Sequence, residues 1–193
     1  MMMTQRRVAF VSTLVVVLIG AIAVAWYSLG PSRRVQTASQ APITGKAQVG
    51  QLAPEFAVAT TAGLFDLAKA TKPVFLEIFA TWCPHCQREA AVIDKLYSAY
   101  RNRVAFVGVS GSDTAMDGTS EASQADVLAW TQRYNVRYPV AYDAQLTVAN
   151  LYLSPSGFPT LVIIGKDKKV AYLNAGEISY DDLATALNSV LPR

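Results

Sequence analysis

The sequence predicts an α/β domain in which a mixed β-sheet is flanked by helices. Short apolar runs rich in β-forming residues alternate with segments of helical periodicity, in the order strand, helix, strand, helix, strand, strand, helix. Of the 193 residues, 52% are hydrophobic and 16% are charged. A chain of this composition can bury a sizeable core and is not disordered.

Each element is predicted from its own pattern. Four apolar runs bounded by turn residues are expected to be strands: 74–80, 103–110, 160–165 and 170–175. Four segments with helical spacing are expected to be helices: 84–101, 124–134, 146–153 and 179–191. The last helix has Ser179 as its expected N-cap, with Asp182 in the third position of a capping box.

The N-terminal part is expected to lie outside the folded domain. Residues 8–30 form an uncharged run long enough to cross a bilayer, so residues 1–30 are interpreted as a transmembrane anchor. The alternative is a cleaved signal peptide, because residues 23–25 read Ala-Val-Ala. Residues 31–47 are rich in small and polar residues and are interpreted as a flexible linker to a domain at 48–193.

Charge and cysteine content exclude several classes of protein. The net charge is +3, but from residue 46 onward 13 Lys and Arg face 14 Asp and Glu, which argues against a nucleic-acid partner. Two cysteines and one histidine are too few for a structural zinc site, which needs four ligands, so no metal site is predicted. Gln87 follows Cys86, and the haem-attachment motif needs histidine there.

The stretch "FATWCPHC" contains both cysteines, Cys83 and Cys86. Pro84 favours the first helical position, which places Cys83 at the N-cap. The free N–H groups and the dipole of that helix favour a thiolate, so Cys83 is expected to be the nucleophile. Cys86 lies one turn further along the helix and can attack a mixed disulfide formed at Cys83. The only cofactor expected is therefore the redox-active disulfide Cys83–Cys86.

Three neighbours are expected to modulate this dithiol. Pro84 and His85 lie between the cysteines, where His85 can favour the thiolate, and Trp82 precedes them. Arg88 and Gln87 are expected to be surface residues. Two alternatives remain open: an incidental pair of buried cysteines, and a metal-binding dithiol in which His85 is the third ligand. A metal held by Cys83 and Cys86 alone would be copper(I), which thiolates suit.

The sequence resembles the thioredoxin superfamily, in particular its membrane-tethered TlpA/ResA-like branch. The resemblance covers about residues 48 to 192 and rests on five motifs: "APEF" (53–56), "FATWCPHC" (79–86), "VGVS" (107–110), "YPVAYD" (138–143) and "GFPTLVIIGKDKKV" (157–170). It implies a thioredoxin-like fold with an N-terminal extension and an inserted strand-and-helix element. It also implies an extracytoplasmic domain that exchanges disulfides with partner proteins.

The resemblance assigns a role to Pro159, which should follow a cis peptide bond and pack beside the cysteines. The alternative is an ordinary trans proline at a strand start. The adjoining backbone at Phe158 should then pair with an extended substrate peptide. Thr160, on the other side of the proline, is expected to border the same substrate site.

Two acids are candidates for proton chemistry. Glu77 lies in the buried strand 74–80, where desolvation should raise its pKa and suit it to accept the proton of Cys86. The alternative is a carboxylate paired with a lysine such as Lys72, or one that reaches solvent. Glu89 resembles a residue that tunes the site in one subgroup of the family, and the alternative is a solvated helix charge.

The leading functional hypothesis is a membrane-anchored thiol–disulfide oxidoreductase. The architecture resembles reductants that act on apocytochrome c or metallochaperones, and a membrane redox-relay partner would supply the electrons. The dipeptide Pro84-His85 instead resembles DsbA-type oxidants, which makes an oxidant or isomerase of secreted proteins the alternative. A copper-binding protein comes next. A peroxiredoxin-type peroxidase comes last, because Thr81 lies one position too close to Cys83.

Overall fold

The computed structural model describes residues 46–192. The expected anchor at 8–30 and nearly all of the linker at 31–47 lie outside the described residues. Between residues 46 and 192, no helix is both long enough and apolar enough to cross a bilayer.

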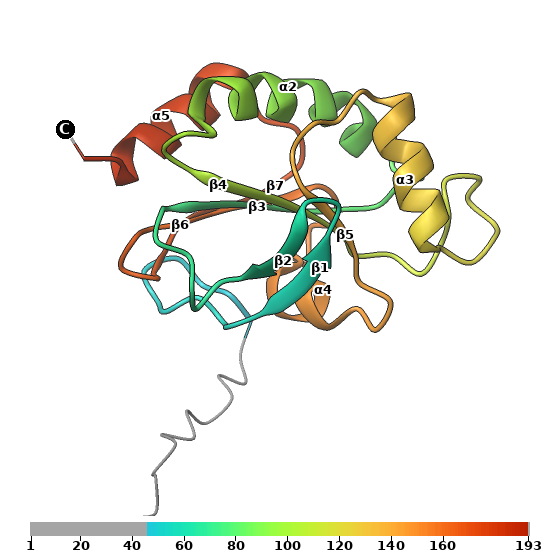
Figure 1. The fold of residues 1–193 in the computed structure, drawn as a ribbon, viewed down its shortest axis with the longest axis horizontal. Helices are drawn as coiled ribbons and strands as arrows, with labels where there is room; N and C mark the ends of the chain where they lie inside the picture. Colours follow the sequence, from blue (N-terminus) through green and yellow to red (C-terminus); the bar gives the residue numbers. More distant parts are fainter. Residues whose placement is uncertain (1–45, 193) are drawn as a thin grey trace, which may run out of the picture. The chain divides into compact units, whose positions relative to one another are not determined.

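A seven-stranded mixed sheet forms the centre of the domain, in the order β2-β1-β5-β4-β3-β6-β7 (Figure 1). The bounds are β1 Ala57–Thr60, β2 Gly63–Asp66, β3 Val74–Phe79, β4 Ala105–Ser110, β5 Val140–Tyr142, β6 Thr160–Ile164 and β7 Val170–Ala175. Strand β3 pairs with β4 in parallel and with β6 antiparallel, and all six of its residues are buried. A strand covered on both faces reads as a continuous apolar run, which is why "VFLEIF" is recognisable in the sequence.

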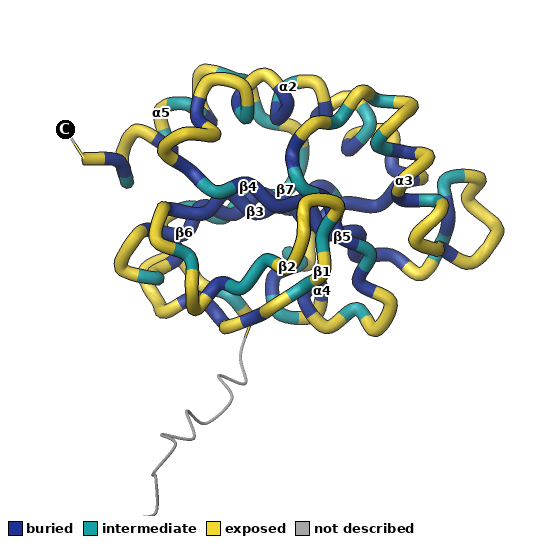
Figure 2. The backbone as a smooth tube through the Cα atoms, viewed as in Figure 1, coloured by how far each residue is buried: buried dark blue, intermediate teal, exposed yellow. Residues whose placement is uncertain are grey.

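Helices cover both faces of this sheet, as the sequence predicts (Figure 1). Their bounds are α2 Pro84–Tyr100, α3 Gln124–Arg133, α4 Thr147–Tyr152 and α5 Tyr180–Val190. Helices α2, α3 and α5 share one apolar core with the sheet, and α4 shares a second core on the other face. Figure 2 shows the buried strands between these two layers.

Two parts of the sheet were not expected as strands. The hairpin β1–β2 is half exposed, and its four-residue strands carry few of the β-branched residues that mark a strand locally. Strand β5 is only three residues long. These segments become strands because they pair with each other and with β4, which is a tertiary effect.

Ser179 is the N-cap of the last helix, as predicted. The Ser179 hydroxyl accepts a hydrogen bond from the backbone N–H of Asp182 at 3.2 Å and donates to the carboxylate of Asp182 at 2.6 Å. In a capping box the third side chain accepts instead from the backbone N–H of the N-cap residue, so these two contacts supply only the first half of the expected box.

Candidate active site

Both cysteines lie where the central strand β3 leads into helix α2. Cys83 is the N-cap of α2, with extended backbone (φ −77°, ψ 119°), and Pro84 begins the helix, as expected. Both residues are free cysteines, and Cys83 is 5% exposed whereas Cys86 is fully buried. The expectation that the first-turn N–H groups bind the Cys83 sulfur is not met, because its side chain makes no capping hydrogen bond to the helix.

The thiol of Cys83 is directed across to the loop before β6. Its Sγ donates to the backbone carbonyl of Phe158 at 3.9 Å. The Phe158–Pro159 peptide bond is cis, as the resemblance implied. The chain that approaches β6 therefore presents its backbone to the Cys83 sulfur, although more than 70 residues separate the two segments in the sequence.

Trp82 forms the rim of this site. It is 38% exposed, and its ring lies edge-on to the ring of Phe158, with the centroids 6.1 Å apart. Its indole N–H donates to the hydroxyl of Ser112 at 2.9 Å, which links the rim to the loop between β4 and α3. Sequence reasoning missed Ser112, because nothing in a polar loop indicates which of its hydroxyl groups meets the indole.

Thr160 does not face a substrate with its side chain. It is fully buried, and its hydroxyl donates to the carbonyl of Gly157 and accepts a hydrogen bond from the N–H of Ser154. The expectation that its side chain borders the substrate is therefore corrected. Thr160 supports the loop around Pro159 from the inside.

Glu77 lies in the interior of the sheet, fully buried, beside the dithiol. The Tyr138 hydroxyl donates to its Oε2 at 2.8 Å, while its Oε1 has no hydrogen-bond partner. Burial raises the pKa of Glu77 to about 8; the hydrogen bond from Tyr138 opposes this rise and the charge of Glu89 adds to it. A carboxyl group that titrates near neutral pH is suited to proton transfer.

Cys86 is coupled to this acid. Burial is the main reason that the pKa of Cys86 is raised, and the negative charge of Glu77 is the second. A backbone hydrogen bond with Ala80 acts in the opposite direction. Cys86 therefore needs a proton acceptor before it can attack, and neutral Glu77 must lose its own proton before it can serve as one.

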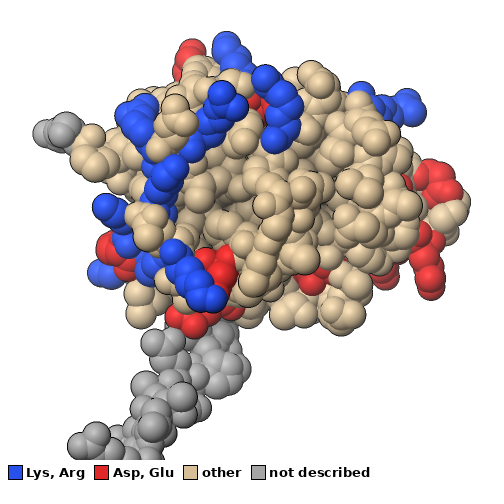
Figure 3. Space-filling model, viewed as in Figure 1, with Lys and Arg blue, Asp and Glu red and all other residues tan. Residues whose placement is uncertain are grey.

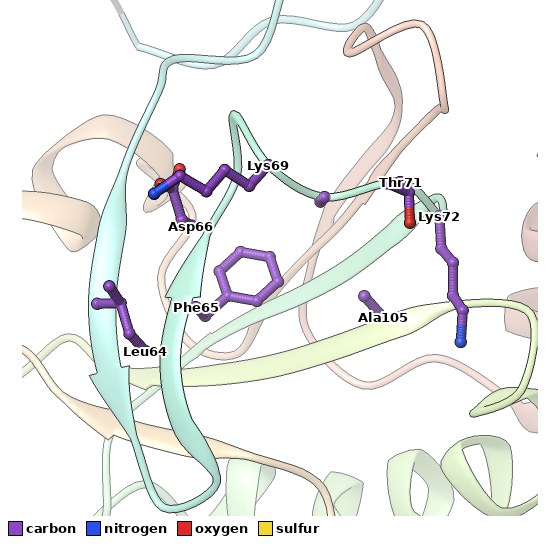
Figure 4. Close-up of a pocket in the computed structure, with 8 residues that line it drawn as sticks. Leu64, Phe65, Asp66, Lys69, Thr71, Lys72 and Ala105 are labelled. Atoms are coloured by element: carbon purple, nitrogen blue, oxygen red, sulfur yellow. The ribbon is translucent and has the colours of Figure 1, made fainter.

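The lysine alternative for Glu77 is wrong. Lys72 is exposed and lines a surface pocket of about 410 Å³ between β2 and the start of β3 and β4 (Figure 4). This is the end of β3 opposite to the cysteines, so Lys72 serves no function at the dithiol. The true partner, Tyr138, lies within the motif "YPVAYD", but the motif alone does not reveal where its hydroxyl points.

Glu89 is not a solvated helix charge. It is 1% exposed, its Oε2 accepts a hydrogen bond from the N–H of Ile178 at 3.2 Å, and its Oε1 has no hydrogen-bond partner. Burial raises the pKa of Glu89 to about 7, against the effect of that hydrogen bond and with a smaller rise from the charge of Glu177. The region of the dithiol thus has two buried acids, Glu77 and Glu89, that are electrostatically coupled.

His85 and Arg88 meet an acid that sequence reasoning missed, Glu177, in the loop between β7 and α5. His85 Nδ1 lies 2.6 Å from Glu177 Oε1, and Arg88 Nη2 lies 2.5 Å from the same oxygen. Arg88 is exposed, as expected, but it is not an isolated surface charge. Gln87 is half-buried, and its amide donates to the carbonyl of Thr81 at 2.9 Å.

The hydroxyl of Thr81 forms a hydrogen bond within the protein. It donates to the carboxylate of Asp126 at 2.7 Å, and the other oxygen of Asp126 accepts a hydrogen bond from the N–H of Met116. Thr81 is fully buried in this arrangement. Among residues 46–192, no group of three or more His, Cys, Asp or Glu side chains is arranged to hold a metal ion.

Charge is unevenly distributed over the face seen in Figure 3. Basic side chains gather mainly toward the side where α5 ends, with some acidic ones among them, and a second group of acidic side chains lies toward the loop before α3. The broad surface between them carries little charge. The hydrogen bond from Trp82 to Ser112 places the loop before α3 beside the active site.

A Cys-x-x-Cys pair at a helix start, with its second thiol fully buried, and a cis-proline loop on this sheet define the class of the protein. It is a thiol–disulfide oxidoreductase with a thioredoxin-like fold. Residues 49–173 match the AhpC/TSA family, and the chain belongs to that family.

Proteins of known class resemble this chain over most of its length. The thiol-disulfide oxidoreductase ResA of Bacillus cereus is 30% identical over 152 residues, which cover 76% of this chain and 81% of that protein. ResA of Geobacillus kaustophilus is 26% identical over 196 residues, which cover 99% of this chain and 100% of that protein.

Solved structures share the fold. A secreted Mycobacterium tuberculosis disulfide oxidoreductase, described as homologous to E. coli DsbE, has a TM-score of 0.57 at 23% identity over 69% of this chain and 95% of that one. StoA from Bacillus subtilis has a TM-score of 0.55 at 17% identity over 68% of this chain and 95% of that one. At these identities the likeness shows the fold alone.

Proposed function

We propose that the protein is a membrane-anchored reductase that works outside the cytoplasm and reduces disulfide bonds of partner proteins. The observation that carries this proposal is the asymmetry of the dithiol. Cys83 keeps a small exposed surface, with its sulfur against the Phe158 carbonyl, whereas Cys86 is fully buried beside Glu77. The Cys83 sulfur can therefore contact a substrate, and the Cys86 sulfur can react only with Cys83 inside the protein.

The reaction proceeds by two thiol–disulfide exchanges. The Cys83 thiolate attacks a substrate disulfide, so that the substrate S–S bond breaks, one substrate thiolate leaves and a mixed disulfide forms. Glu77 in its ionised form then accepts the proton of Cys86. The Cys86 thiolate attacks the Cys83 sulfur and releases the second substrate thiolate. The substrate has gained two electrons, and the protein holds the Cys83–Cys86 disulfide.

Substrate binding is proposed to use the backbone beside Pro159. An extended peptide can pair with the chain at Phe158 in the manner of strand addition. Trp82 offers an exposed aromatic surface at the rim, next to the attacking sulfur. Main-chain pairing recognises many sequences, so selection of the partner falls to side chains around this rim.

Location and direction of electron flow are part of the proposal. The uncharged run 8–30 supports a membrane anchor, and residues 31–47 provide the linker to the domain. The relatives are named thiol-disulfide oxidoreductases, which supports disulfide exchange. The direction of a reductase, with apocytochrome c or a metallochaperone as the class of substrate, is proposed from the resemblance of the sequence motifs to the TlpA/ResA-like branch. Reduction outside the cytoplasm then needs a membrane redox-relay partner that returns electrons to the disulfide.

Fractionation of cells that produce the full chain tests the anchor. The full chain should stay in the membrane after a high-salt wash, and a variant that begins at residue 42 should be released. Release of both proteins would contradict membrane anchoring without affecting the redox proposal.

The reduction potential of residues 42–193, which form a compact unit of their own, tests the direction of electron flow. Equilibration with a glutathione or dithiothreitol series should give a reversible couple near about −250 mV, slightly above the roughly −270 mV of thioredoxin because of His85 in the motif.

A potential between about −120 and −180 mV would contradict the reductase proposal and favour the second candidate, an oxidant or isomerase of secreted proteins. That candidate rests on Pro84-His85 between the cysteines. Absence of a reversible couple, together with stoichiometric copper(I) on the purified domain, would favour a copper-binding protein instead.

A further inference from the structure

Three charged or titratable side chains form a cluster outside the dithiol, the His85–Arg88–Glu177 cluster. The two Glu177 oxygens both accept from Arg88 Nε at 3.1 Å, and Oε1 also lies 2.5 Å from Arg88 Nη2. The contact is therefore multidentate, which fixes the plane of the guanidinium group. The cluster joins the first turns of α2 to the loop between β7 and α5, 89 residues further along the chain.

The third member, His85, has two partners at one atom. Its Nδ1 lies 2.6 Å from Glu177 Oε1 and 2.9 Å from Arg88 Nη2. Arginine can only donate, and an ionised carboxylate can only accept. Nδ1 with a hydrogen therefore bonds to Glu177, and Nδ1 without one bonds to Arg88. Nδ1 therefore has a hydrogen-bond partner within the cluster in either protonation state.

The charges of this cluster act on the reactive cysteine. The hydrogen bonds of Arg88, followed by that of His85, lower the pKa of Glu177 to about 2, so this acid is ionised at neutral pH. The pKa of Arg88 is raised chiefly by the hydrogen bond with Glu177, and the charge of Cys83 also contributes to the rise. Geometry supports the same link, because Cys83 is the N-cap of α2 and the first turns of that helix carry His85 and Arg88. The carboxylate of Glu177 contacts the same guanidinium group and opposes its positive charge.

We propose that Arg88 and Glu177 are positioning residues that set the reduction potential of the Cys83–Cys86 couple from outside the motif. The inference rests on the proposed disulfide exchange. Arg88 stabilises the thiolate of the reduced form and so raises the potential. Glu177 anchors Arg88 and opposes its charge, which lowers the potential and keeps the CPHC dithiol in the range of a reductase.

Two charge-neutralising variants test this inference with opposite expected signs. Arg88→Gln leaves Glu177 uncompensated and should lower the potential, and Glu177→Gln leaves Arg88 uncompensated and should raise it. The pair is more than a third exposed, so solvent screening keeps each change small. We expect about a threefold change in the equilibrium constant with glutathione for each variant, which corresponds to about 14 mV.

The controls separate charge from structure. Arg88→Lys keeps the charge and should remain close to the parent protein. Arg101→Gln removes a charge at the opposite end of the same helix and should not change the potential. Urea unfolding of every variant reports any structural damage separately.

Shifts of the same sign in both variants, or no shift in either, would overturn the inference. In that case the parent protein still shows a reversible couple, so the proposed function stands. If the parent protein shows no couple at all, the proposed function fails first, and the inference falls with it.

Discussion

Replacement of Cys83 with alanine will abolish disulfide exchange, and replacement of Cys86 with alanine will trap the protein in a mixed disulfide with its substrate. Only the Cys83 sulfur can be reached from outside, because Cys86 is fully buried. Without Cys83 no mixed disulfide forms. Without Cys86 the mixed disulfide forms but has no second thiol to resolve it.

Mass spectrometry of each variant, incubated with a peptide disulfide, measures this outcome. The Cys86→Ala variant should accumulate an adduct of one peptide thiol, and the Cys83→Ala variant should show none. Alkylation of the reduced native protein should label Cys83 and spare Cys86. The chain has only two cysteines, so the double variant serves as the blank. Adduct formation at Cys86 in the Cys83→Ala variant would contradict the assignment of roles.

Replacement of Glu77 with glutamine will stabilise the fold at neutral pH and slow the release of substrate. Glu77 is fully buried, and its pKa is raised from 4.5 to about 8. Between these two values the folded state holds a proton that the unfolded state has lost. The free energy of unfolding therefore decreases as pH rises from about 4.5 to about 8.

The magnitude follows from the same linkage. At about 1.4 kcal/mol per pKa unit, the raised pKa of Glu77 lowers the free energy of unfolding at pH 7 by on the order of 3 kcal/mol relative to acidic pH. Glutamine is uncharged and can keep an oxygen at the position that accepts the Tyr138 hydroxyl, so Glu77→Gln should recover much of this energy. Urea unfolding across the pH range measures the effect.

Glu89 provides the matched comparison. Its pKa is raised to about 7, so it contributes a similar decrease in stability that ends at lower pH. In the Glu77→Gln variant the free energy of unfolding should therefore no longer decrease above about pH 7. Below about pH 7 it should still decrease with rising pH, because Glu89 remains. Equal stability of the Glu77→Gln variant and the parent protein at every pH would show that the pKa of Glu77 does not differ between the folded and unfolded states.

The kinetic effect of Glu77→Gln falls on the second exchange. Glutamine cannot accept the Cys86 proton, and general acid–base catalysis contributes about 10²- to 10⁴-fold. We expect release from the mixed disulfide to slow by about 100-fold at pH 7, while the first attack by Cys83 changes little. Single-turnover kinetics separate the two steps. An equal slowing of both would point to a general disturbance of the site.

Some of these features were available from local sequence. Strand β3 followed by Pro84 within a Cys-x-x-Cys motif predicted a dithiol at a helix start, because a buried strand and a helix N-terminus each leave a local pattern. Helix α2 was expected at 84–101 and spans Pro84–Tyr100. The cis bond before Pro159 followed from the family resemblance rather than from any local physical pattern.

The contacts that adjust the chemistry were not available from the sequence. Tyr138 lies 61 residues from Glu77, and Glu177 lies 89 residues from Arg88. Periodicity indicates that a residue is buried or exposed, but not which partner it meets. The sequence by itself therefore determined the sheet's central strands, the helices and the position of the cysteine pair at the start of a helix. Only the tertiary structure decided how Glu77, Glu89 and Arg88 are partnered, because pKa values depend on groups brought together by folding.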